Sequence, residues 1–148
     1  MSALRLATPD DLDRLTSLVA RYHTLEGIEQ DDATRLAALT PLLDGSPHGA
    51  IWLIGPRSAP VGYIAVCFGW SIEMGGLDAI VDEFFIREKV RGRGMGSEAL
   101  AALARALADL DIKALHLEVA TDNDAAKRLY TRLGFQARDK YHLMTRLL

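Results

Sequence analysis

Three glycines stand at alternate positions, 92, 94 and 96, in a segment that reads VRGRGMGSEAL. Glycine lets the backbone turn where a side chain would clash, so successive N–H groups can point into one concavity. An apolar helical pattern begins directly behind this segment, and the dipole at a helix N-terminus attracts anions. Arg91 and Arg93 add positive charge. We therefore interpret the segment as a phosphate-binding loop; the alternative is an ordinary glycine turn at the surface.

Two other phosphate-binding loops fit this segment less well. A Walker loop needs a lysine after its last glycine, but here Ser97 follows Gly96 directly. The dinucleotide fingerprint G-x-G-x-x-A does fit Gly94, Gly96 and Ala99, and Glu118 stands where a ribose-binding acid would be. In that fold, however, the glycines follow the first strand at once, whereas the residues REKVR intervene here. Too little chain remains for a six-stranded parallel sheet.

The elements around the loop can be predicted from hydrophobic periodicity and turn residues. The expected strands cover residues 4–7, 50–54, 61–68, 79–86, 114–120 and 141–147. The expected helices cover residues 9–22, 31–43, 94–110 and 124–133. Hairpins come first, and one strand–helix–strand crossover follows. This order predicts an α/β protein with a mixed, mostly antiparallel central sheet and helices on both of its faces.

Composition limits the classes of function. At 148 residues the chain is expected to form a single domain, residues 1–148, with an ordinary hydrophobic core. A net charge of −3 disfavours binding to nucleic acid, and no stretch of about 18 apolar residues predicts a membrane span. The single cysteine, Cys67, is interpreted as a buried inert thiol, and the four histidines show no metal-ligand spacing. We expect a cytoplasmic protein without a metal.

The glycine loop resembles the R/Q-x-x-G-x-G/A signature of the GNAT family of N-acetyltransferases, whose loop amides hold the pyrophosphate of acetyl-CoA. The resemblance extends through the second half of the chain. The segment DEFFI at 82–86 is similar to the fourth strand of the family, and HLEVATDN at 116–123 is similar to its fifth strand and the turn that follows. The segment NDAAKRLYTRLGF at 123–135 is similar to its last helix. DEFFI with RGRGMGSEAL also looks like the corresponding segment of the polyamine acetyltransferases. The N-terminal half fits in element order only.

The resemblance implies a GNAT fold and acetyl transfer to a primary amine by direct attack in a ternary complex. The amine must lose a proton, and the family uses a carboxylate near the fourth strand for this step. Asp82 and Glu83 are the candidates, and as neighbours on a strand they are expected to point to opposite faces. The polyamine pattern favours Asp82, while Glu83 stays in play. Tyr130 stands where the family places the general acid for the departing thiolate.

The resemblance also assigns contacts with acetyl-CoA. The expected residues are a stretch of main chain, the loop and two positions near the last helix: Phe84, Phe85, Ile86, Arg91, Gly92, Arg93, Gly94, Met95, Gly96, Ser97, Asn123 and Tyr130. An amide near Phe85 or Ile86 is the candidate oxyanion donor. Asn123 can also cap the helix that it precedes.

Several alternatives stay open at this point. The chain could be a non-catalytic coenzyme A or acyl-CoA sensor, or it could transfer a longer acyl group. The acceptor is expected to be a small-molecule or lysine amine, with a cationic amine among the options. The oligomeric state is also open, with a homodimer as one candidate. The sequence does not decide which of Asp82 and Glu83 faces the acceptor.

Overall fold

The first four strands of the sheet follow one another as antiparallel neighbours in the computed structural model, which describes residues 4–148. The strands are β1 (Leu4–Leu6), β2 (Gly49–Ile54), β3 (Gly62–Ser71), β4 (Gly76–Ile86) and β5 (Leu115–His116). The helices are η1 (Pro9–Asp11), α1 (Leu12–Glu26), α2 (Asp32–Leu43), η2 (Glu88–Val90), α3 (Met95–Asp109) and α4 (Asp124–Arg132). β5 joins β4 in parallel after the crossover through α3, so the predicted mixed sheet is confirmed.

The chain divides into two compact units, one ending at Glu118 and the other formed by Val119–Leu148. All five strands and the helices α1, α2 and α3 belong to the first unit, whereas α4 belongs to the second. The acceptor carboxylates and the glycine loop predicted from the sequence therefore lie in the first unit, and Asn123 and Tyr130 lie in the second.

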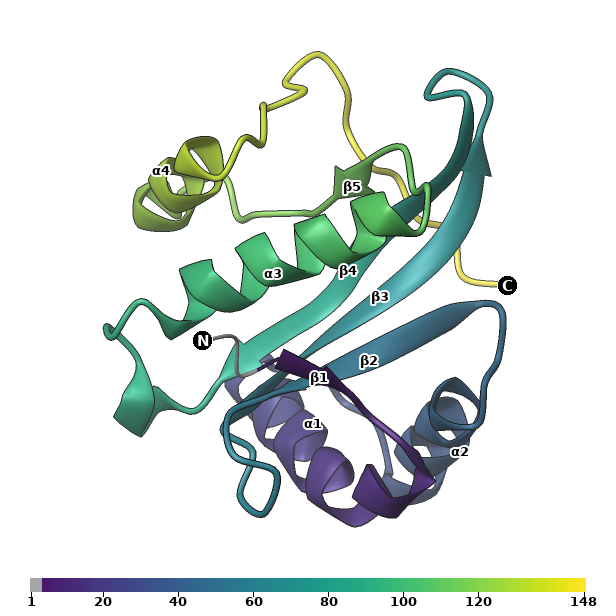
Figure 1. Ribbon diagram of the computed structural model, residues 1–148, viewed down its shortest axis with the longest axis vertical. Helices are drawn as coiled ribbons and strands as arrows, with labels where there is room; N and C mark the ends of the chain where they lie inside the picture. The colour runs from purple at the N-terminus through teal and green to yellow at the C-terminus, as the bar shows by residue number, and fades with distance from the viewer. Residues whose placement is uncertain (1–3) are drawn as a thin grey trace. The chain divides into compact units, whose positions relative to one another are not determined.

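Helices cover both faces of the sheet in the first unit, as Figure 1 shows for α3 in front of β4. On one face, α1 and α2 pack against strand residues such as Tyr63 and Phe85 to form the main core. On the other face, Phe84 and Ile86 contact the start of α3 at Gly96. Successive residues of β4 thus point to opposite helical layers, as the alternation of a strand requires.

Local sequence explains where the helices begin and end. Asp31 accepts a hydrogen bond of 2.7 Å from the backbone N–H of Thr34 and so caps α2. Gly27 ends α1 in the left-handed conformation, φ 69°, which a residue without a side chain adopts without strain. One position departs from the expected pattern: Leu36 on α2 is exposed, and Arg35 is buried beside it.

Two predicted strands differ from the structure. β5 covers only Leu115–His116 instead of residues 114–120. The predicted strand at 141–147 is wrong, because no strand is assigned there. A strand needs a neighbour for its backbone groups, and the second unit contains no other strand among its described residues. The adjacent apolar residues Leu143 and Met144 also break the alternation of a half-buried strand.

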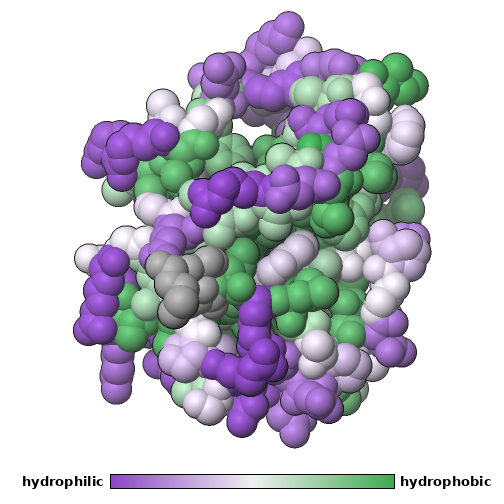
Figure 2. Space-filling view, viewed as in Figure 1, coloured by the Kyte–Doolittle hydropathy of each residue, from purple (hydrophilic) through white to green (hydrophobic). Residues whose placement is uncertain are grey.

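Hydrophilic side chains are interspersed with hydrophobic ones on the face of the molecule in Figure 2. Among residues 4–148, none of the helices is both long enough and apolar enough to cross a lipid bilayer. The longest helices instead show the pattern of a globular protein: α3 buries Ala99, Leu100, Leu103 and Leu107 on a single stripe.

Candidate active site

The two edges of β4 differ in how much of their length is paired with another strand. β4 pairs with β3 from Gly76 to Ile86, with one interruption at Asp82. On its other edge it pairs with β5 only at Ala79 and Ile80. Within residues 4–118, the main chain of β4 beyond Ile80 therefore has no strand partner on that side. An extended ligand can pair with such an edge as a strand would, and the predicted acetyl-CoA contacts at Phe84–Ile86 lie along it.

A β-bulge interrupts β4 at the predicted catalytic carboxylates. Ala65 of β3 pairs with Glu83, but the next residue, Val66, pairs with Val81, which leaves Asp82 without a partner in β3. A bulge bends its strand and re-aims the side chains around it. The strict alternation that we expected for Asp82 and Glu83 therefore does not hold at this point, because Asp82 is the extra residue of the bulge.

Glu83 points toward α1 and is held by two donors. Its Oε2 lies 2.7 Å from Nε2 of His23 on α1, and its Oε1 accepts a hydrogen bond of 2.8 Å from the hydroxyl of Tyr63 on β3. Both partners are buried, and Tyr63 is 0% exposed, whereas the Glu83 side chain remains 20% exposed. Glu83 is thus a fixed carboxylate with one side open to solvent.

Asp82 has different electrostatic surroundings. Asp82 is an exposed residue whose carboxyl group loses only part of its hydration. Its pKa is raised above the ordinary value, first by this partial loss and then because the carboxylates of Glu83 and Glu118 disfavour a further negative charge. A protonated His23 would act in the opposite direction. A carboxylate with a raised pKa is a better proton acceptor at neutral pH, which is the property that a general base requires.

The same carboxylates affect the neighbouring side chains. Burial and the charges of Asp82 and Glu83 raise the pKa of the Cys67 thiol. A thiol with a raised pKa forms less thiolate and is a poor nucleophile. Cys67 is half-buried, not fully buried as we expected. Among residues 4–148, no group of three or more histidine, cysteine, aspartate or glutamate side chains is arranged to hold a metal ion.

The glycine loop connects η2 to α3 and turns through two left-handed residues. Gly92 has φ 81° and Gly94, the N-cap of α3, has φ 75°, a region that residues with a side chain rarely adopt. The first N–H groups of α3, from Met95 onward, have no partner within the helix itself. Gly96 lies close to the sheet: a Cβ there would stand 3.3 Å from Cδ1 of Ile86. The glycines thus give the loop the shape expected of an anion-binding segment.

The two loop arginines have different environments. Arg91 donates a hydrogen bond of 2.8 Å from Nε to the carbonyl oxygen of Ile86, and its guanidinium lies 5.7 Å from the ring centroid of Phe85. It therefore ties the loop to the end of β4. Arg93 is exposed and stands between Gly92 and Gly94. We expected both arginines to supply charge, and the structure adds a structural contact for Arg91.

The second unit contains the remaining two predicted site residues. Asn123 accepts a hydrogen bond of 3.1 Å from the N–H of Ala126 and so caps α4. Tyr130 is half-buried on α4, and its ring packs edge-on against Phe135 at a centroid distance of 5.9 Å. Burial raises the pKa of Tyr130, so its hydroxyl keeps its proton over a wider pH range.

The structure also places side chains near the carboxylates that the sequence analysis did not single out. These are His23, Tyr63 and Arg35, and each is buried. Arg35 donates from Nε to Nδ1 of His23 at 3.4 Å. The sequence did contain a signal for the burial of His23. His23 lies eight residues after Leu15 and four after Val19, so it falls on the apolar stripe of α1 that is buried.

Comparisons with known proteins identify the family and the fold. The sequence profile of the acetyltransferase (GNAT) family matches residues 12–135. The uncharacterized N-acetyltransferase YycN of Bacillus subtilis (strain 168) is 39% identical over 62 residues, which are 42% of this chain and 40% of that protein. The spermine/spermidine N(1)-acetyltransferase of the same strain is 44% identical over 57 residues, 38% of each protein. The matched segment thus spans about two fifths of the length of these curated relatives.

A solved structure resembles the chain over nearly all of its length. It is an integron cassette protein from the mobile metagenome of Cole Harbour salt marsh, 32% identical, with a TM-score of 0.86. The match covers 99% of this chain and 91% of that protein. Both units described above therefore have counterparts in one known fold.

Proposed function

The chain belongs to the acetyltransferase (GNAT) family, and on that premise we propose that it transfers an acetyl group from acetyl-CoA to a primary amine by direct attack in a ternary complex. The observation that carries the proposal is the position of Asp82, which is the extra residue of the bulge in β4 and lies on the strand whose edge has no partner beyond Ile80 within residues 4–118. The raised direction of its pKa agrees with a role as base. The same strand leads through Ile86 and η2 into the glycine loop. The proposed base thus lies on the strand that leads directly into the proposed coenzyme-binding loop.

Residues of this chain can accept and supply the protons that the proposed reaction transfers. The amine nitrogen forms a bond with the thioester carbonyl carbon, and the bond between that carbon and sulfur breaks. Asp82 takes the proton that the amine loses, and Tyr130 gives a proton to the departing thiolate. An amide near Phe85 or Ile86 stabilises the developing oxyanion, because the main chain of β4 is open on one side.

The residues around the coenzyme suit its chemistry. Its pyrophosphate needs N–H donors and positive charge, which the loop from Arg91 to Ser97 offers at the start of α3. Its pantetheine arm is an extended amide chain, which can pair with the open edge at Phe84–Ile86. Asn123 is proposed as a further contact of this arm. When bound, acetyl-CoA supplies the activated acetyl group.

We propose a small cationic amine as the acceptor. Glu83 is held with one side exposed, and the charges of Glu83 and Glu118 both act on Asp82, so negative charge gathers at this part of the sheet. A carboxylate cluster attracts cations and fixes their orientation. The similarity to a spermine/spermidine N(1)-acetyltransferase agrees with an acceptor that carries more than one amino group.

The test is an assay of thiol release from acetyl-CoA with a panel of amines: diamines, polyamines, aminoglycosides, amino acids and a lysine peptide. The matched control is a tertiary amine of equal charge and similar size, which has no N–H to lose. We expect turnover with a multiply charged primary amine, none with its tertiary analogue, and a product heavier by one acetyl group. Tight coenzyme A binding without turnover on any amine would contradict the proposal and indicate a sensor.

A further inference from the structure

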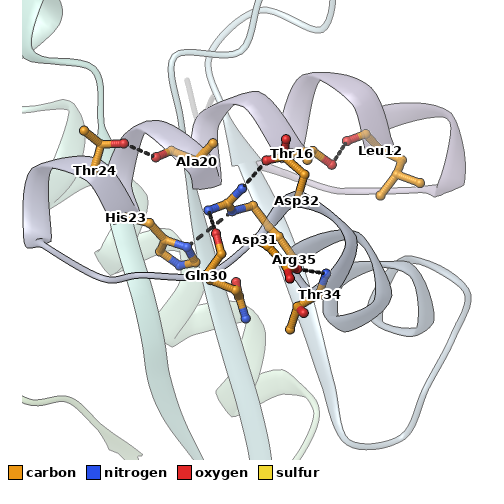
Figure 3. A network of polar contacts seen from close by, with 10 residues as sticks. All are labelled: Leu12, Thr16, Ala20, His23, Thr24, Gln30, Asp31, Asp32, Thr34 and Arg35. Carbon is orange, nitrogen blue, oxygen red and sulfur yellow. Dashed lines mark hydrogen bonds and ion pairs between the residues drawn. The ribbon is translucent and has the colours of Figure 1, made fainter.

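His23 lies between two charged side chains that come from different elements. Its Nε2 is 2.7 Å from Oε2 of Glu83 on β4, and its Nδ1 is 3.4 Å from Nε of Arg35 on α2. Figure 3 shows the Arg35 side chain reaching from α2 toward the ring of His23 on α1. His23 and Arg35 are only 5% and 6% exposed, so water cannot easily replace either contact.

The chemistry of the two partners decides where the ring carries its proton. Arginine has N–H donors and no acceptor, so Nδ1 of His23 must accept from Arg35 with its lone pair. The ring proton then resides on Nε2, which donates to the carboxylate of Glu83. This is the neutral Nε2–H tautomer, and a second proton on Nδ1 would point at the donor of Arg35.

Arg35 is held in place by two further contacts. Its Nη1 donates to Oδ1 of Asp32, and its Nη2 donates to the carbonyl oxygen of Gln30, each at 2.8 Å. Both partners belong to the segment that begins α2, and Figure 3 shows them around the guanidinium. The planar guanidinium is thus fixed at three points, and its Nε can aim at His23 without a large further loss of side-chain freedom.

His23 has charged and titratable neighbours on every element that packs against it. β4 contributes Glu83 and Asp82, β3 contributes Tyr63 through Glu83, α2 contributes Arg35, and α1 itself contributes Tyr22. The two carboxylates favour a second proton on the ring, whereas burial of the ring and the cation Arg35 oppose it. Arg35 is the charged neighbour that opposes a second proton.

We propose that Arg35 is a positioning residue of the acceptor site: it holds His23 as the neutral Nε2–H tautomer, so that Glu83 keeps its full negative charge toward the acceptor. This inference rests on the proposed function, in which Asp82 and Glu83 face a cationic amine. A cationic His23 would cancel one of the two negative charges. It would also favour ionised Asp82 and so weaken it as a base, because the charge of His23 acts on Asp82.

The tautomer can be measured in the unmodified protein. Ring ¹⁵N chemical shifts distinguish a protonated nitrogen from an unprotonated one, and the spectrum of His23→Gln identifies the signals of His23 among the four histidines. At neutral pH we expect a protonated Nε2 and an unprotonated Nδ1. If the native protein shows an imidazolium, or a neutral ring with its proton on Nδ1, the proposal is wrong. This result needs no Arg35 variant.

The role of Arg35 is tested with Arg35→Met, which keeps a long apolar stem and removes the donor and the charge. We expect protonation of Nδ1 in this variant at a pH where the native ring is neutral, and partial recovery of the native spectrum in Arg35→Lys. Arg21→Met is the matched control, because Arg21 is an exposed arginine on α1 that pairs with Glu88 at 3.5 Å. Ring shifts in Arg35→Met that equal the native ones would refute the assignment.

A kinetic measurement links the tautomer to the acceptor. In Arg35→Met we expect the KM for the amine to rise roughly tenfold, the effect of about one unit charge in partly hydrated surroundings, while the KM for acetyl-CoA stays unchanged. Equal rises in both KM values would indicate a structural role and contradict the proposal. If no amine is acetylated, the proposed function fails, but the spectra still decide whether Arg35 sets the tautomer.

Discussion

The hydroxyl of Tyr63 donates a hydrogen bond of 2.8 Å to Oε1 of Glu83. Tyr63 is completely buried, and its pKa is raised first by burial and then by the charge of Glu83, so it stays a proton donor. With His23 at the other oxygen, Glu83 has a fixed orientation and two occupied acceptor sites. This arrangement suits a residue that binds a cation, and it leaves proton transfer to Asp82.

Removal of the Tyr63 hydroxyl should loosen Glu83. Tyr63→Phe keeps the ring and its packing but deletes a hydrogen bond to a charged group, a change that typically costs about 1.5–3 kcal/mol. We expect the lower end of this range, because Glu83 is partly exposed and can bind water instead. Urea unfolding measures the loss. Tyr141→Phe, a change at an exposed ring, should shift stability by less than about 0.5 kcal/mol, and equal losses for the two variants would contradict this account of Tyr63.

Gly94 should be required for coenzyme binding. Gly94→Val forces a branched residue into φ 75°, which costs on the order of 1–3 kcal/mol and disturbs the N–H groups at the start of α3. Calorimetry should show the loss of most of the coenzyme A affinity. Gly75→Val is the matched control, because Gly75 has φ 89° and open space where a Cβ would stand, as Gly94 does, but lies in the turn between β3 and β4. If both variants bind coenzyme A as the native protein does, the pyrophosphate assignment is wrong.

The two loop arginines should respond differently to salt. Arg93→Gln removes a charge from an exposed side chain, so its effect on coenzyme A affinity should shrink as ionic strength rises. Arg91→Gln also breaks the hydrogen bond to the Ile86 carbonyl, so part of its effect should persist at high salt. Titrations of both variants at low and high salt make the comparison. A loss of affinity confined to coenzyme A and absent with dephospho-coenzyme A would instead assign the arginines to the ribose phosphate.

Tyr130→Phe separates proton donation from packing. The ring and its contact with Phe135 remain, and only the hydroxyl is lost. General acid catalysis is typically worth about 10²–10⁴ in rate, and we expect the low end because a thiolate is a tolerable leaving group. Since burial raises the pKa of Tyr130, the high-pH limb of kcat should lie above the range of an ordinary tyrosine and disappear in the variant. Identical kcat–pH curves for the two proteins would make Tyr130 a packing residue.

Local sequence signals predicted the elements well, because each one depends on neighbouring residues. The glycine spacing at 92–96 indicated a turn before a helix, and Gly92 and Gly94 make this turn with positive φ. Hydrophobic periodicity predicted the helix at 94–110, and α3 buries one stripe of apolar residues, although Leu110 beyond its end is 62% exposed. The antiparallel hairpins likewise followed from apolar runs separated by turn residues.

The details of the site depend on contacts between distant segments, which periodicity does not describe. The bulge at Asp82 exists only in relation to Ala65 and Val66 on β3. The burial of Arg35 in place of Leu36 depends on how α2 meets His23 on α1. The final strand was predicted from its local hydrophobic pattern, and a local pattern does not supply the partner that a strand needs.

The pH dependence of kcat/KM for the amine tests the central claim most directly, measured for the native protein, Asp82→Asn and Glu83→Gln. Because the pKa of Asp82 is raised, the account predicts an acid limb above the ordinary range of an aspartate, since activity is lost as Asp82 gains its proton. Asp82→Asn should remove that limb and lower kcat about 10²–10⁴-fold. Glu83→Gln should keep the limb and mainly raise the KM for the amine. The opposite pattern, with the limb lost in Glu83→Gln and retained in Asp82→Asn, would contradict the assignment of Asp82 as the base.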